Sequence, residues 1–199
     1  MRYLLFTFLV LIGSSCQQSK PADLAVEKSG FILPAPPKWT TESFPVPPSF
    51  APEISFRGVE DIRFAPGWSK PGSDDYWTYA FVWKLEGSPV IDWGAVEDYL
   101  KAYYTGLIQA NGEGKGIPRS KMGEAAVELT PSGSPGEFRG EIHMMDYMTQ
   151  QPITLRFVIE VNVCPEIEQV YVFHRLSPKS ESDPVWDKMN ELWRDFKCD

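Results

Sequence analysis

One predicted strand carries the residue types that acid–base chemistry requires. Glu141, His143 and Tyr147 are separated by even numbers of residues, so the alternation of a β-strand places their side chains on one face. An imidazole beside a carboxylate serves general acid–base catalysis and also binds metal ions. A solvated polar face of a half-buried sheet explains the same spacing equally simply, so these three residues are only candidate catalytic residues.

The other short motifs are explained by turns. Residues 111–116 (NGEGKG) follow a predicted helix, and Gly116 stands where a phosphate-binding loop requires Ser or Thr. Residues 132–136 (SGSPG) lack the G-x-S-x-G spacing of a hydrolase nucleophile. The second histidine, His174, is expected on the apolar face of its strand or at the rim of that face. We therefore expect no metal site and no cofactor, and a hydrolase-like enzyme using carboxylates and His143 stays an alternative.

Aromatic side chains are the stronger candidates for binding. Trp68 lies in a Pro-Gly loop that is expected to present it to solvent, and Tyr76 and Trp77 open an aromatic strand. Exposed rings stack on sugars and apolar ligands and are enriched at binding surfaces. Packing of the rings in a core is the competing explanation.

The elements that position these residues are predicted from periodicity. Residues 76–86 and 152–163 alternate between apolar and polar side chains, as half-buried strands do. Further strands are expected at 58–64, 124–130, 137–148 and 168–175. Helices are expected at 92–110, capped by Asp92, and at 183–197, where Asp183 precedes Pro184.

This order of elements predicts an α+β fold. Short turns between successive strands indicate an antiparallel sheet of about five to six strands. Antiparallel sheets commonly keep one face wet, so both helices are expected to pack on the other face.

Length and charge restrict the classes of function. The 199 residues suffice for a leader, a linker and one domain, and a hydrophobic content of 43% supports a proper core. The net charge of −8 argues against nucleic acid as a partner. No apolar run reaches the roughly 20 residues of a membrane-spanning helix.

The N-terminus has the organisation of a secretory signal peptide over residues 1–15. Arg2 supplies the positive start, residues 3–12 form a short apolar core, and residues 13–15 are small. Residues 12–16 (IGSSC) resemble the lipobox of bacterial lipoproteins, although Gly13 stands where Leu, Val or Ile is usual. This resemblance implies that Cys16 is the first mature residue, that it is lipidated, and that the protein is anchored in the cell envelope.

The resemblance also bears on location. Gln17 beside the lipidated cysteine is compatible with sorting to the outer membrane. Ordinary cleavage after Ser15 would instead leave a periplasmic protein.

Residues 16–51 are expected to form a proline-rich tether to a single domain at 52–199, because prolines favour extended spacers. An arm wrapped on the domain surface is the alternative for residues 39–52. In an oxidising compartment Cys164 and Cys198 are candidates for a disulfide, although two unpaired thiols are also compatible with the sequence.

A segment of the body is similar to exported bacterial proteins of unknown function. It runs from Phe64-Ala65-Pro66-Gly67 through Asp75-Tyr76-Trp77 to residues 79–83. This resemblance implies no activity. We expect a non-catalytic binding or structural module of the envelope, with an envelope protein, a glycan or an apolar ligand as partner.

Overall fold

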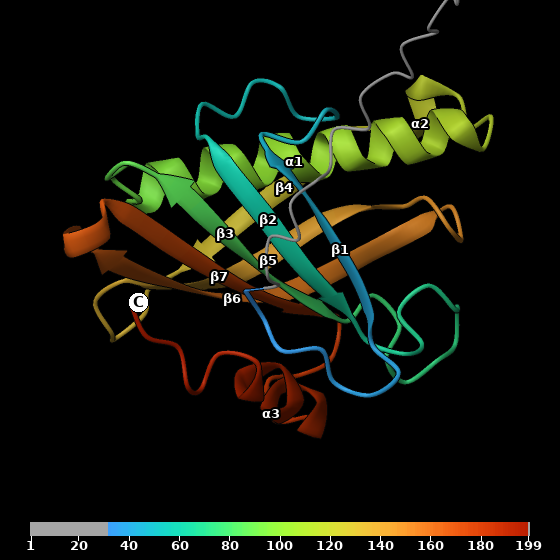
Figure 1. Cartoon of the computed structure of the whole chain (residues 1–199). Coiled ribbons are helices and arrows are strands. Elements are labelled where there is room, and N and C mark those ends of the chain that lie inside the picture. Colours follow the sequence, from blue (N-terminus) through green and yellow to red (C-terminus); the bar gives the residue numbers. More distant parts are fainter. Residues whose placement is uncertain (1–31, 199) are drawn as a thin grey trace, which may run out of the picture. The chain divides into compact units, whose positions relative to one another are not determined.

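The computed structural model describes residues 32–198, whose strands form a seven-stranded sheet (Figure 1). All neighbouring strands are antiparallel, in the order β1-β2-β3-β7-β6-β5-β4. The strands are β1 (Thr40–Val46), β2 (Gly58–Phe64), β3 (Tyr79–Glu86), β4 (Ala126–Thr130), β5 (Glu137–Asp146), β6 (Gln151–Cys164) and β7 (Gln169–Ser177). The helices are α1 (Trp93–Gly114), α2 (Arg119–Met122), the 3-10 turn η1 (Pro165–Ile167) and α3 (Pro184–Glu191).

The α+β class is as predicted, but the sheet has seven strands instead of five to six. The additional strand is β1, which lies in the segment expected to be a tether and pairs with β2 along its whole length. The described part of the presumed tether, residues 32–51, therefore belongs to the domain. The predicted signal peptide, Cys16 and the remainder of the tether lie outside the described residues.

The arm before β1 is held by a buried ion pair. The carboxylate of Asp61 accepts hydrogen bonds from the amides of Ile32 and Leu33 at 2.7 and 2.8 Å. The same carboxylate pairs with Arg63 at 2.6 Å, and the Arg63 Nε donates to the carbonyl of Pro34 at 2.8 Å. Both charged side chains are almost fully buried, which ties the arm firmly to β2.

The two predicted helices, α1 and α3, begin where the sequence predicts. The side chains of Asp92 and Asp183 accept hydrogen bonds from the first turns of α1 and α3 at 2.9 and 3.0 Å. The predicted ends were less accurate, because α1 continues to Gly114 and α3 stops at Glu191, not at 197.

The two helices lie on opposite faces of the sheet, so the expectation that both share one face was wrong (Figure 1). The reason is that the central strands are apolar on both sides. In β3, Phe81 and Trp83 face α1, while Ala80 and Val82 belong to the core beneath α3. No wet face is left at the centre of the sheet.

The alternation predicted for residues 76–86 is confirmed. Trp77, Tyr79, Phe81, Trp83 and Leu85 are all buried in the core on the α1 side. In β6 the same alternation holds for most of the strand, but Val163 near its end is 58% exposed. The aromatic strand is therefore core, not an exposed binding surface.

Cys164 and Cys198 form a disulfide with a Cα–Cα distance of 5.5 Å. It joins the end of β6 to the segment after α3, which closes the C-terminus against the sheet (Figure 1). Within residues 32–198, no helix is both long enough and apolar enough to cross a membrane.

Candidate functional site

A cavity lined mainly by aromatic side chains lies between α1 and the β1–β2–β3 side of the sheet. It has a volume of about 270 Å³. Its inner wall consists of buried side chains: Ile62, Phe64, Trp77, Tyr79, Tyr103 and Tyr147. Its mouth consists of half-buried or exposed side chains: Glu42, Phe44, Phe50, Trp68, Leu107 and Asn111. We call this cavity the aromatic pocket.

The rings of the aromatic pocket hold one another in place. Trp68 stacks on Phe64 with centroids 4.3 Å apart and meets Trp77 nearly at right angles at 6.4 Å. Trp77 in turn contacts Tyr147 edge to face at 5.3 Å. Such tilted and stacked contacts are the favourable geometries between rings, so the lining is preorganised before any ligand enters.

The backbone at Trp77 is strained. Its φ angle is +52°, a left-handed conformation that bulky residues rarely adopt and that costs on the order of 1–3 kcal/mol. The side chain is nevertheless completely buried and forms part of the pocket wall. The fold thus sustains local strain at a residue whose ring lines the cavity.

Hydrogen bonds to the Asp146 carboxylate fix the loop that carries Tyr76. The Tyr76 hydroxyl donates to Asp146 at 2.5 Å, and the amide of Met148 donates to the same carboxylate at 2.8 Å. Burial opposes ionisation of Asp146, but hydrogen bonds from Thr149, Tyr76 and Met148 outweigh it and lower the pKa of this carboxyl. Tyr76 therefore positions the loop and does not line the aromatic pocket.

A buried carboxyl group lies just behind the pocket wall. Glu60 accepts hydrogen bonds from Trp83 Nε1 and from the Tyr103 hydroxyl, both at 2.8 Å. Its side chain is completely buried, and desolvation raises its pKa to about 8. Glu60 is therefore largely protonated at neutral pH, which removes a charge from the core.

The core that contains Glu60 also contains a buried histidine, His174. The expectation that it lies on the apolar face is confirmed, since its ring is completely buried and stacks on Phe81 with centroids 4.0 Å apart. Its Nε2 is 2.9 Å from the Tyr99 hydroxyl. Desolvation lowers the pKa of His174 to about 3, so this imidazole is neutral.

The structure brings together only two of the three candidate catalytic residues. His143 Nε2 lies 3.8 Å from Glu141 and 3.7 Å from Glu128, and its Nδ1 is 3.0 Å from Thr154 Oγ1. Tyr147 is buried on the opposite face, because β5 ends at Asp146 and the alternation stops there. The pair lies on the sheet surface, away from the aromatic pocket.

The open depression beside His143 includes one carboxylate, Glu124. Within residues 32–198, no three His, Cys, Asp or Glu side chains are gathered closely enough to hold a metal ion.

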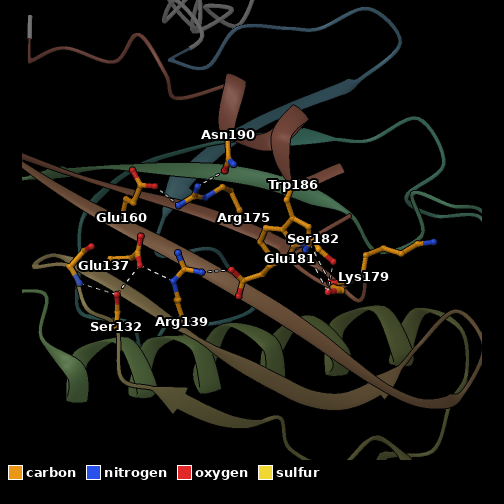
Figure 2. A network of polar contacts seen from close by, with 12 residues as sticks. Ser132, Glu137, Arg139, Glu160, Arg175, Lys179, Glu181, Ser182, Trp186 and Asn190 are labelled. Atoms are coloured by element: carbon orange, nitrogen blue, oxygen red, sulfur yellow. Dashed lines mark hydrogen bonds and ion pairs between the residues drawn. The ribbon is translucent and has the colours of Figure 1, made fainter. Parts of the chain in front are cut away.

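The polar groups near α3 form a structural network instead of a site. Figure 2 shows Arg139 between Glu137 and Glu181, with Ser132 donating to Glu137 at 2.7 Å. The hydrogen bond from Arg139 lowers the pKa of Glu137.

A second series of side-chain contacts in Figure 2 runs from Glu160 through Arg175 to Asn190. These contacts link β6, β7 and α3. Each carboxylate in this network pairs with an arginine, so the network orients α3 on the sheet.

Three lining residues were candidates from the sequence, Trp68 and Trp77 for binding and Tyr147 for catalysis, but most of the pocket was missed. Glu42, Phe44 and Phe50 lie in the segment expected to be a tether, and Tyr103 lies within the predicted helix 92–110. Comparison of the chain with protein-family models, curated proteins and solved structures finds no match.

Proposed function

We propose that this protein is an exported, lipid-anchored cell-envelope protein whose domain binds a small, largely apolar molecule without catalysis. The aromatic pocket carries this proposal. Eight of its twelve lining residues are aromatic, and its volume of about 270 Å³ exceeds the roughly 150 Å³ that holds a benzene ring in a protein core. A preformed apolar cavity with few polar groups is the usual form of a small-molecule site.

Two features support export and anchoring. The leader of residues 1–15 and the segment ending at Cys16 resemble those of bacterial lipoproteins, apart from Gly13 in the lipobox. The Cys164–Cys198 disulfide is of a kind that forms and persists in oxidising compartments outside the cytoplasm. Gln17 favours the outer membrane, and a periplasmic location is the alternative if Cys16 is not lipidated.

The pocket is tested with neutral aromatic probes. We expect indole or p-cresol to bind saturably to the wild-type domain, measured by calorimetry or saturation-transfer NMR. Trp68→Ala removes a ring from the mouth and should weaken binding about tenfold, given the energy of a ring–ring contact and its buried area.

The matched control is Trp93→Ala. This tryptophan on α1 is 43% exposed and does not line the pocket, so its loss should leave affinity unchanged. Equal affinities of wild type and Trp68→Ala, or the absence of saturable binding, would contradict a ligand site here.

Lipidation is tested separately in a bacterial host fed a clickable palmitate analogue. Cys16→Ala is expected to abolish acyl labelling, because the lipobox cysteine is the acylated residue. Cys198→Ser is the control and should still be labelled, since it removes a cysteine of the disulfide only. Persistent labelling of the Cys16→Ala protein would exclude the lipoprotein assignment.

A further inference from the structure

We propose that the ligand of the aromatic pocket carries a methylated ammonium group, so that the pocket selects a small organic cation over a neutral molecule of the same shape. This inference rests on the proposed function and specifies its ligand. Two features of the pocket carry it, the charge at its mouth and the nature of its walls.

The charge at the mouth is negative and lacks a partner. Glu42 is the one acidic residue among the lining residues, and no lysine, arginine or histidine lines the pocket. It is exposed on β1 and pairs in register with Ile62 of the inner wall. Among residues 32–198, no ion pair or hydrogen bond of the Glu42 side chain is found.

The negative charge of Glu42 affects the pKa values of groups in and behind the pocket wall. Burial, followed by the negative charges of Asp146 and Glu42, raises the pKa of Tyr147 to about 12. The same charge also adds to the effect of burial on Glu60, behind the wall. A cation bound between Glu42 and the rings would therefore enter a negative potential.

The walls suit a cation whose charge is spread over methyl groups. The faces of Trp, Tyr and Phe are electron-rich and attract ammonium groups within about 6 Å, most strongly where water is excluded. Tyr103 and Phe50 meet edge to face at 5.0 Å, and Trp68 lines the same cavity. Methyl groups on the nitrogen also satisfy the apolar lining, which offers few acceptors for N–H donors.

A negatively charged ligand is disfavoured in this pocket. An anion would face Glu42 without any basic side chain in the lining, in a protein of net charge −8. A neutral ligand of the same shape would gain nothing from the exposed Glu42 carboxylate. A small cation gains the attraction of this charge and also fits the apolar lining.

The test compares choline with its neutral carbon isostere, 3,3-dimethylbutan-1-ol, by calorimetry on the domain with its disulfide intact. Choline is expected to bind about tenfold more tightly, within the range of a desolvated cation–π contact. Glu42→Gln should weaken choline about fivefold and leave the isostere unchanged. Glu97→Gln is the matched control, because it removes an exposed carboxylate of α1 that does not line the pocket.

Phosphocholine separates a free cation from a lipid headgroup. It carries the same ammonium group with a phosphate, for which the lining offers no basic side chain, so it should bind at least about tenfold more weakly than choline. Phosphocholine binding as tightly as choline would overturn the assignment to a free cation.

Two further outcomes are distinguishable. If choline and its isostere bind with the same affinity, the pocket binds ligands but the inference of a cation is wrong. If neither these nor the neutral aromatic probes bind, the proposed function fails together with the inference.

Discussion

The Glu60→Gln variant is expected to keep a nearly constant free energy of unfolding between pH 6.5 and 8, where that of the wild type falls. In the folded protein Glu60 has a pKa of about 8, against an ordinary value of 4.5. The folded state therefore retains a proton that the unfolded state releases, and stability falls as the pH rises from 4.5 to 8. The total loss is on the order of 5 kcal/mol, at about 1.4 kcal/mol for each unit of pKa difference.

His174 has the opposite effect on the acid side. Its pKa of about 3 lies below the ordinary 6.5, so the unfolded state binds a proton that the folded state excludes. The contribution of His174 is present above pH 6.5 and is lost as the pH falls toward 3. Between pH 4.5 and 6.5 the two groups compensate, and the wild type should be most stable in that interval.

Urea unfolding followed by tryptophan fluorescence between pH 4 and 9 measures both effects. Glutamine at position 60 keeps a carbonyl oxygen that accepts from Trp83 Nε1, and its amide can donate to the Tyr103 hydroxyl in place of the hydrogen bond that this hydroxyl donates to Glu60. The difference between variant and wild type should grow with pH above 4.5, whereas Glu97→Gln should run parallel to the wild type. A Glu60→Gln curve parallel to the wild type would show that this carboxyl titrates normally.

Loss of the disulfide is the second large effect. Cys198→Ser is expected to lower the free energy of unfolding by about 4 kcal/mol, because the bridge closes a loop across a sequence separation of 34 residues. Cys198 is suited to this substitution since it is exposed, whereas Cys164 is fully buried. Chemical denaturation of the oxidised wild type and the variant measures the difference.

Reductant provides the internal control for this prediction. Wild-type protein in dithiothreitol should unfold at the same denaturant concentration as Cys198→Ser, while the variant itself should not respond. A loss below about 1 kcal/mol would show that the bridge does not restrict the unfolded chain in the way that loop-closure entropy requires.

The parts of the fold that were predictable have local causes. The alternation of residues 76–86 and the aspartate caps of α1 and α3 depend on neighbours a few positions away. The face on which each helix packs was not predictable in this way. It depends on whether Ala80 and Val82 meet water or a second helix, and that is decided by residues a hundred positions later.

The aromatic pocket was hidden for the same reason. Glu42 and Phe44 are pocket residues only because β1 pairs with β2, and the prolines of that segment favoured an extended spacer. The sequence contained one signal of the buried carboxyl group behind the pocket. Glu60 lies on the same strand face as Ile62 and Phe64, where it interrupts a row of apolar side chains. An acidic residue in that register indicates a buried, protonated carboxyl group.

The order of strands in the sheet also governs how this chain folds. The β3 strand pairs with β7, the central strand of the sheet, so Tyr79 meets Leu176 across about a hundred intervening residues. The N-terminal three strands thus stay without their inner neighbour until almost the entire polypeptide has left the ribosome. Such a high contact order favours slow acquisition of structure, on the scale of milliseconds to seconds. For the export proposed above, a sheet that is completed late keeps the chain unfolded while it crosses a translocation pore.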